Sequence, residues 1–350
     1  MRATTSLVAG FAALCLVSSA CGASSVTSTT AGHTQPTGST ASTHAAPPGR
    51  WSVPRLIDDD GFASVSCTSA SFCIAVDFSG HALRWNGSSW SSPHKIAGSL
   101  WSVSCTSPSF CMAVGDSKPP PVSYYAVTWN GSTWSKPTNM EPKHDYQANI
   151  ETIVSCVSSS FCEASGGEGN LLTWDGSRWS AAKGGTLSDP FPLFTYVSCT
   201  SRSFCMAVRT EEDAYYVLRW NGASWSPPGR LRSPYGQLLA VSCPTVSFCM
   251  TTGFYQDPDD EASYAIWDGR TWTAPVQLAH TLIDALSSVS CVSRTFCMAV
   301  GYSSAQRWDG KSWTAPQSIY ANFSLSWVSC PIASFCMAVD QEGHFLKWST

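Results

Sequence analysis

Charged residues are scarce in this chain, and neither a strongly basic stretch nor a helix-forming composition is found in it. Only 13% of its 350 residues are charged, and the net charge is −4 with no stripe of Lys and Arg. This balance argues against nucleic acid as a partner. Helical bundles and coiled coils need Ala, Leu, Glu and Lys, whereas this chain has 16 Trp, 25 Gly and 21 Pro. The composition therefore favours an all-β protein.

Cysteine is abundant, and its number indicates a compartment. The chain has 16 Cys, which is unusual for a protein of the reducing cytosol. We therefore expect an oxidising, extracytoplasmic location.

The N-terminus has the pattern of a secretory signal peptide over residues 1–20. Met-Arg is followed by an apolar run from Leu7 to Val17 and by Ser18, Ser19 and Ala20. The run is shorter than the roughly 20 residues that a membrane span needs. Cys21 follows directly and resembles the acylated cysteine of bacterial lipoproteins, although Ser18 stands where Leu is usual. We expect a lipid anchor at Cys21 as the only membrane attachment, with ordinary cleavage and free secretion as the alternative.

Residues 21–50 are predicted to be a disordered tether. After Cys21 they are mostly Ser, Thr, Gly, Ala and Pro, with no aromatic residue and a single charge at Arg50. A flexible chain of this length spans roughly 30 Å. Such a tether holds a folded domain away from a surface.

From residue 51 onward the chain repeats. The tripeptide Val-Ser-Cys occurs seven times, and a second Cys follows six positions after each first one. The period is about 44 residues, which is typical of a β-propeller blade. In the first unit the four expected strands are Ala63–Cys67, Phe72–Val76, His81–Trp85 and Trp90–Ile96.

The third and fourth strands of each unit meet at the motif Trp-Asn/Asp-Gly-x-x-Trp. Asn-Gly and Asp-Gly favour tight hairpin turns, and the two Trp are expected to pack on one face of the sheet. The last unit ends with Trp348 and has no fourth strand, while residues 51–57 before the first unit have the pattern of one. We therefore predict a seven-bladed β-propeller over residues 51–350 with four-stranded blades, in which the N-terminal strand pairs with residues 346–348 and completes the C-terminal blade.

The paired cysteines lie on neighbouring strands of one blade, at a separation suited to disulfides. Zinc is the alternative, but it usually needs Cys two residues apart together with His, and the seven His do not recur beside the pairs. We expect no metal and no cofactor. The predicted bridges are Cys67–Cys73, Cys105–Cys111, Cys156–Cys162, Cys199–Cys205, Cys243–Cys249, Cys291–Cys297 and Cys330–Cys336.

A few aromatic and histidine positions stand apart from the cysteine and turn motifs. Trp101 and Trp327 lie at the starts of two predicted first strands, and we expect them in the core, with a channel mouth as the alternative. His81 and His344 occupy matching positions in their repeats, which favours a structural role.

Variation in loop length points to one face of the propeller. The Cys-to-Cys and Trp-to-Trp spacings are constant, while the two other connections of each unit vary, and these share one rim because strands alternate in direction. The densest charge of this rim predicts the binding residues, with a solvated polar rim as the alternative. The candidates are Arg209, Glu211, Glu212, Asp213, Arg230, Arg232, Asp257, Asp259, Asp260 and Glu261. The acidic run 257–261 lacks the Gly and the distal Glu of an EF-hand calcium loop.

The repeat Ser-Cys-x5-Cys-x-Ala-Val with Trp-Asn/Asp-Gly-x-x-Trp resembles repeats of secreted bacterial β-propeller proteins, in the kelch/galactose-oxidase-like or sialidase-like group. A sialidase-like site implies an arginine cluster, for which Arg209, Arg230 and Arg232 are available. The turns at Asp268 and Asp309 resemble the Asp box but are one residue shorter. A galactose-oxidase-like site implies copper and a Tyr–Cys crosslink, for which the paired cysteines leave no thiol.

No catalytic constellation is apparent, and propellers host many unrelated functions. We expect a monomeric, extracytoplasmic binding scaffold that recognises a cell-surface protein or glycan through its variable-loop face. A glycan-active, sialidase-like hydrolase is the alternative, and a purely structural envelope component is a third hypothesis.

Overall fold

The computed structural model describes residues 49–117, 122–141, 151–166, 170–184, 194–211, 214–231, 236–255, 261–278, 285–302, 304–319 and 324–350. One compact unit spans Ala46–Thr350. The predicted signal peptide, Cys21 and nearly all of the predicted tether lie outside the described residues. Arg50, which we assigned to the tether, instead opens the first strand. Among the described residues, no helix is long and apolar enough to cross a lipid bilayer.

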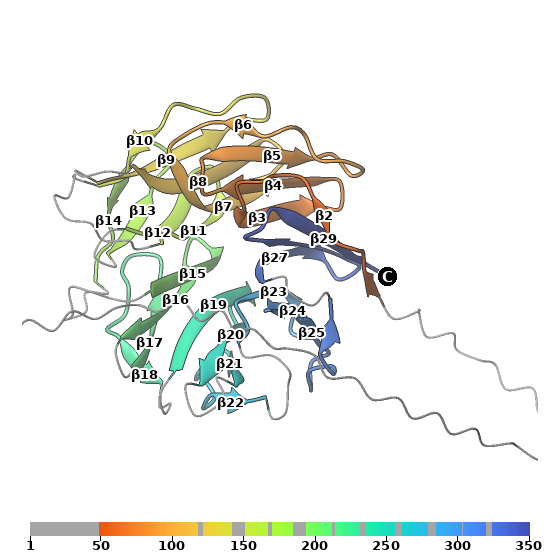
Figure 1. The fold of residues 1–350 in the computed structure, drawn as a ribbon. Helices are drawn as coiled ribbons and strands as arrows, with labels where there is room; N and C mark the ends of the chain where they lie inside the picture. Colours follow the sequence, from red (N-terminus) through yellow and green to blue (C-terminus); the bar gives the residue numbers. More distant parts are fainter. Residues whose placement is uncertain are drawn as a thin grey trace, which may run out of the picture. The chain divides into compact units, whose positions relative to one another are not determined.

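The unit is a seven-bladed β-propeller of antiparallel sheets (Figure 1). In each blade the sheet extends from an inner strand to an outer strand. The outer strand is short because the apolar residues of the repeat concentrate in its first three strands. From inner to outer strand, blade 1 consists of β3 (Phe62–Ser69), β4 (Phe72–Asp77), β5 (His81–Trp85) and β6 (His94–Lys95). Blade 2 consists of β7 (Ser99–Ser107), β8 (Phe110–Ser117), β9 (Ser123–Trp129) and β10 (Thr138–Asn139). Blade 3 consists of β11 (Val154–Ser158), β12 (Phe161–Ser165), β13 (Leu171–Trp174) and β14 (Trp179–Ala181).

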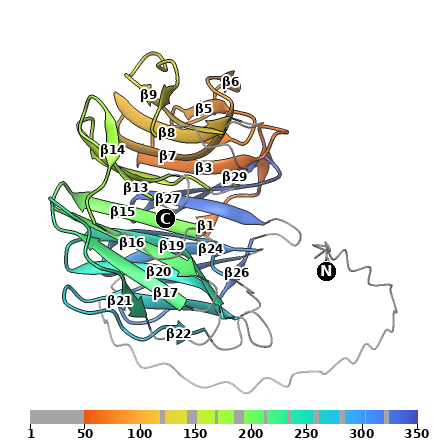
Figure 2. The same cartoon turned by 90° about the vertical axis from the view of Figure 1, so that its left-hand side faces the viewer.

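The remaining blades follow the same plan around the ring, as the two views show (Figures 1 and 2). Blade 4 consists of β15 (Phe194–Ser201), β16 (Phe204–Glu211), β17 (Ala214–Trp220) and β18 (Gly229–Leu231). Blade 5 consists of β19 (Gly236–Thr245), β20 (Phe248–Tyr255), β21 (Ala262–Trp267) and β22 (Val276–Gln277). Blade 6 consists of β23 (Ser288–Ser293), β24 (Phe296–Gly301), β25 (Ser304–Trp308) and β26 (Gln317–Ser318). Blade 7 has β27 (Leu325–Ile332), β28 (Phe335–Asp340) and β29 (His344–Ser349), with β1 (Arg50–Trp51) and β2 (Arg55–Leu56) outermost.

The two ends of the propeller sequence share blade 7. Trp51 pairs with Trp348, and Leu56 pairs with His344. The inner strand of blade 7, β27, in turn contacts that of blade 1, β3. The fourth strand expected over residues 51–57 is therefore present in the predicted place, but it is split into two short segments.

The outer strands are shorter than the sequence predicted. In blade 1 the expected strand Trp90–Ile96 is reduced to His94–Lys95, preceded by an isolated bridge between Trp85 and Trp90. The two rings lie 5.8 Å apart, and the Trp pairs of the five following blades lie 5.7 to 6.1 Å apart. The predicted packing of Trp across the turn is confirmed.

The Asn or Asp of each Trp-Asn/Asp-Gly turn holds the turn through its side chain. In blade 1, Asn86 Oδ1 accepts hydrogen bonds from the backbone N–H groups of Ser88 and Ser89, both at 2.9 Å. Asp268 and Asp309 accept the equivalent bonds in their own turns. Asn and Asp are interchangeable here because only one acceptor oxygen is used, so these turns need no Asp-box function.

All seven predicted disulfides are present, each between the inner strand and the second strand of one blade. The Cys in the second strand of every blade is fully buried. The bridges therefore fix each blade internally and do not join one blade to another.

Hydrogen bonds between blades explain the serine of Val-Ser-Cys. Its Oγ accepts a hydrogen bond from the N–H of the corresponding Cys in the next blade, at 2.9 to 3.0 Å, in all seven blades. The series closes where Cys67 donates to Ser329. An inner strand has an unpaired edge, and each serine satisfies one N–H of that edge in its neighbour.

Candidate functional site

Residues at the starts of the inner strands of all seven blades converge on one cavity of about 140 Å³. Because every blade contributes, this cavity is the mouth of the central channel. It lies on the rim formed by the β4–β5 type of turn and by the connections between blades, which is the rim with variable loops. The residues used below are Phe78, Trp101, Glu151, Tyr196, Trp327 and Gln341. We call this site the channel-mouth cavity.

β-Bulges in the inner strands direct side chains into the cavity. The pairing register shifts around Ala63, Trp101, Leu239 and Ser326, and all four residues line the cavity. A bulged residue is left out of the ladder and re-aims its side chain. A regular strand would turn the side chain of Trp101 elsewhere.

The expectation that Trp101 packs in the core is therefore wrong. Its ring lines the cavity and packs edge-on against Phe78, with centroids 5.3 Å apart. Its Nε1 donates a hydrogen bond to Asp116 Oδ2 at 3.1 Å, which fixes the ring. Trp327 combines both alternatives, since it lines the cavity and also packs against two apolar clusters, one of blades 1 and 7 and one of blades 3 to 5.

Glu151 supplies a carboxylate beside these rings. Burial raises the pKa of its carboxyl above the usual range. Burial also raises the pKa of Tyr196, and the nearby charge of Glu151 adds to that effect. Within the described part of the chain, Glu151 makes no ion pair. Aromatic rings with one carboxylate are the surroundings that a cationic group prefers.

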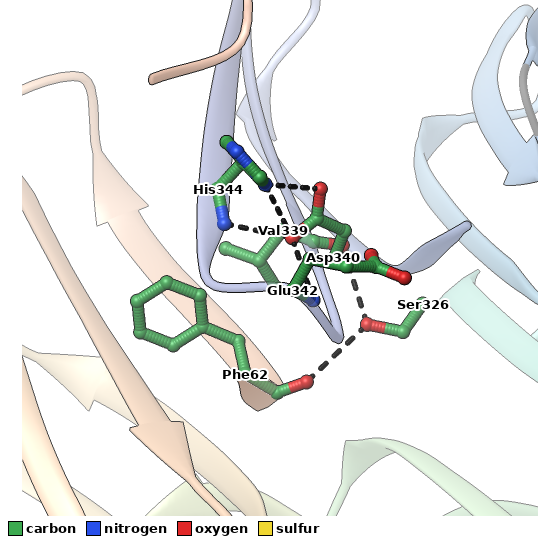
Figure 3. A network of polar contacts seen from close by, with 6 residues as sticks. All are labelled: Phe62, Ser326, Val339, Asp340, Glu342 and His344. Carbon is green, nitrogen blue, oxygen red and sulfur yellow. Dashed lines mark hydrogen bonds and ion pairs between the residues drawn. The ribbon is translucent and has the colours of Figure 1, made fainter. Parts of the chain in front are cut away.

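The blade 7 side of the cavity is held by a network of polar contacts (Figure 3). Ser326 Oγ donates to the carbonyl of Val339 at 3.2 Å. Asp340, fully buried, accepts the N–H groups of Glu342 at 3.1 Å and His344 at 2.7 Å, and so fixes the turn that carries Gln341. The structural role predicted for His344 is confirmed, and His81 makes the same pair of contacts to Asp77.

Three larger grooves of about 310, 400 and 350 Å³ lie on the outer circumference between adjacent blades. Two of them are bordered by the Trp of the Trp-Asn/Asp-Gly turns, which occur in every continuous unit. These grooves follow from the repeat and its short outer strands. Each of these three grooves lies between two blades, whereas described residues of all seven blades line the channel-mouth cavity, so we take it as the candidate site.

Of the predicted charged residues, the structure describes the side chains of Arg209, Arg230 and Glu261, and none of these three lines the cavity. Arg209 lies within β16 and is only 3% exposed, so its expected place in a surface loop is wrong. Glu211 ends β16, Arg230 is exposed in the outer strand β18, and Glu261 is half-buried before β21. The other predicted residues lie outside the described part of the chain: Glu212, Asp213, Arg232, Asp257, Asp259 and Asp260.

Two of the three arginines considered for a sialidase-like site, Arg209 and Arg230, lie in register with one another across the sheet of blade 4. Arg209 pairs with Tyr216 in β17, and Tyr216 pairs with Arg230. Because paired residues point to the same face of a sheet, the three side chains lie on one side of the blade. Neither arginine lines the channel-mouth cavity, and one is buried. The arrangement does not form an open arginine cluster.

No protein-family model matches this chain, and no curated protein matches its sequence. Solved structures similar to it include YCF48 bound to a D1 peptide, with a TM-score of 0.62 at 12% identity over 86% of this chain and 97% of that one. YCF48 from Cyanidioschyzon merolae gives 0.61 at 14% identity over 85% and 99%, and the WD40 β-propeller domain of Doa1 gives 0.61 at 11% identity over 85% and 97%. At such identities the likeness shows the fold alone. These neighbours are YCF48 and WD40 propellers, and not the kelch or sialidase-like propellers that the repeat resembles.

Proposed function

We propose that this protein is an extracytoplasmic, lipid-anchored scaffold that binds a protein partner at the channel-mouth cavity and the loops around it. The observation that carries the proposal is the meeting of Trp101, Trp327, Tyr196 and Glu151 at the centre of the variable rim. A structurally similar propeller is bound to a peptide, which supports a protein partner over a glycan.

The cavity favours a positively charged side chain of the partner. Indole rings attract Lys or Arg by the cation–π interaction, and a partly desolvated carboxylate strengthens that attraction. At about 140 Å³ the cavity has room for one side chain and not for a domain. We infer that one Lys or Arg of the partner enters the cavity while the surrounding loops contact the rest.

The location rests on separate observations. The signal-peptide pattern of residues 1–20, the cysteine at position 21 and seven disulfides agree with an oxidising compartment. The low-complexity residues up to 48 suit a tether between an acylated Cys21 and the propeller.

Selection from a displayed peptide library tests the binding proposal on the full chain. Peptides selected by the wild type are expected to share a Lys or Arg at one position. Glu151→Gln should bind them about tenfold more weakly, because one close charge interaction is lost. The matched control is Glu342→Gln, which makes the same chemical change on an exposed residue of the same rim.

Equal affinity of the wild type and Glu151→Gln for the selected peptides would contradict the proposed role of the cavity. A glycan array probed with the same three proteins gives the second test. Saturable glycan binding by a protein that selects no peptide would contradict the choice of a protein partner.

A further inference from the structure

Three side chains that can bind a metal ion meet beside the closure of the ring, two from blade 1 and one from the segment that connects blade 7 to blade 1. Asp58 lies between β2 of blade 7 and β3 of blade 1, Asp77 ends β4, and His81 begins β5. One oxygen or nitrogen of each lies within 4.8 Å of the others. His81 Nδ1 is 2.7 Å from Asp77 Oδ2 and 3.5 Å from Oδ2 of Asp60, a fourth candidate ligand that is partly exposed. We call Asp58, Asp77 and His81 the closure cluster.

Asp58 is the residue of this cluster that its surroundings do not satisfy. It is 7% exposed, and its Oδ1 accepts the N–H of Asp60 at 3.1 Å. Its Oδ2 is buried and accepts no hydrogen bond from the described residues. Burial raises the pKa of Asp58, and the hydrogen bond from the N–H of Asp60 partly opposes this rise. The neighbouring carboxyl of Asp77, as a hydrogen-bond partner of protonated Asp58 and through its charge, raises the pKa further, as does the charge of Asp60. A buried carboxylate oxygen needs a partner.

The backbone fixes Asp58 in this position. The backbone N–H groups of Asp58 and Ile57 both donate to the carbonyl oxygen of Gly343 in the turn of blade 7. The N–O distance is 3.4 Å for Asp58 and 3.1 Å for Ile57. Gly343 has φ +89°, and a Cβ there would lie 1.5 Å from the Asp58 carbonyl oxygen. The close approach of the two segments therefore requires glycine and sets the place of Asp58 relative to blade 1.

We propose that Asp58, Asp77 and His81 bind a divalent metal ion of the zinc or manganese type, with Asp60 at the edge of the site. One imidazole nitrogen together with carboxylate oxygens is a ligand set that these ions accept. The ion binds Nδ1 of His81 and provides the partner of Asp58 Oδ2. This revises the expectation from the sequence that no metal is bound. The competing explanation is a single proton shared between the carboxyls of Asp58 and Asp77.

The ion would connect the chain segment that follows the outer strand of blade 7 to blade 1. Because the ligands come together only in the folded ring, the ion binds the folded state and stabilises it. The ion would therefore stabilise the junction between blade 7 and blade 1, and none of its three proposed ligands lines the channel-mouth cavity.

Blade 7 supplies an internal control. Asp340 and His344 make the same pair of contacts as Asp77 and His81. The backbone N–H of His344 donates to Asp340 Oδ1 at 2.7 Å, and His344 Nδ1 lies 3.0 Å from Asp340 Oδ2. Among the described residues they do not join a third His, Cys, Asp or Glu at metal-binding distance. His344→Gln therefore removes a similar side chain that is not among the proposed ligands.

The experiment is calorimetric titration of the full chain, freed of metal by a chelator, with Zn²⁺ and with Mn²⁺ in separate runs. The wild type is expected to bind at least one of the two ions at a saturable site that raises the midpoint of thermal unfolding. Asp58→Asn and His81→Gln should each weaken that binding by at least about tenfold. His344→Gln should bind the ion as the wild type does. Asp77 is left unchanged because it also holds the turn.

The absence of saturable binding of either ion by the folded wild type would overturn the proposal and leave the shared proton as the explanation. Equal binding by the wild type and Asp58→Asn would overturn it as well, and so would an equal loss in His344→Gln. Asp58→Asn keeps the size of the side chain and removes a repelling charge, so it is expected to fold. Circular dichroism checks this.

Discussion

At the scale of single residues, Glu163 stands out in the core. It occupies a position in β12 where five of the other blades have Met and blade 1 has Ile74. The side chain is fully buried, and it accepts hydrogen bonds from Thr173 Oγ1 at 2.8 Å and from Trp225 Nε1 at 3.3 Å. Burial raises the pKa of Glu163 from 4.5 to about 7, and the two hydrogen bonds partly oppose that rise.

The stability of the protein should therefore depend on pH through Glu163. The folded state holds its proton more tightly than the unfolded chain does, so the contribution is full below pH 4.5 and is lost as the pH rises through about 7. The difference amounts to about 3 kcal/mol at most. Denaturant unfolding at several pH values should show the wild type losing stability between pH 5 and pH 8 relative to Glu163→Gln, which keeps an acceptor but does not titrate. Parallel pH profiles of the two proteins would contradict the raised pKa.

Sequence reasoning found some of the important residues and missed others for one reason. The cysteine pairs lie within one blade, where the spacing along the chain determines which residues meet, and the matching positions of His81 and His344 pointed to a structural role although their Asp partners were not foreseen. The serine of Val-Ser-Cys recurs seven times, yet its partner lies in the next blade and no local spacing reveals it. Asp58 was missed likewise, because it meets Asp77 and His81 only once the ring is closed.

At the scale of elements, the six continuous turns between the third and fourth strands form one structural class. Each has a Gly with φ between +95° and +100°. An L-residue rarely adopts this conformation, so the Gly sets the path of the turn and thereby the packing of the two Trp.

Replacing one of these glycines should destabilise its blade. Gly131 has φ +98°, and a Cβ there would lie 3.3 Å from Ser109 Cα. Gly131→Ala is expected to reduce the free energy of unfolding by about 1–3 kcal/mol. Ser132→Ala in the same turn removes only an exposed side-chain hydrogen bond to Asn130 and should cost less than about 0.5 kcal/mol. Guanidinium unfolding curves measure both, and equal losses would contradict the explanation.

The strands that could be predicted are those whose residues belong to the repeated sequence motif. The third strand of blade 1 has the predicted ends, and the second extends one residue further. The outer strand was overestimated because it packs few apolar side chains and is held mainly by the Trp turn. The bulges were not foreseen, since each lies ahead of the Val-Ser-Cys motif from which the inner strands were predicted and leaves that motif unchanged. That is why the core was the expected place of Trp101 and the channel mouth only the alternative.

At the scale of the whole molecule, the fold requires both ends of the propeller sequence. β1 and β2 cover the edge of β29, and the bond from Cys67 to Ser329 completes the serine series. A closed ring leaves only short edges and holds seven inner strands in fixed positions around one channel. The channel-mouth cavity depends on this closure, because every blade contributes to it.

The proposed anchor makes a prediction for the molecule in the cell. If Cys21 is acylated, Cys21→Ala should prevent labelling by an alkyne-tagged fatty acid and release the protein from the membrane fraction. The seven disulfides should form in both proteins, since they lie in the propeller. Membrane retention of Cys21→Ala without lipid labelling of the wild type would contradict the anchor.

The central claim is that binding takes place on the rim around the channel mouth. Tyr302 directly follows β24 on this rim and is 58% exposed, whereas Ser132 is exposed in a Trp-Asn-Gly turn of the opposite rim. A photo-crosslinking amino acid is placed at either position in the full chain at the cell surface. The claim predicts a discrete crosslinked protein species from position 302 and none from position 132. Crosslinks from position 132 alone would show that the partner binds the other rim and would contradict the account.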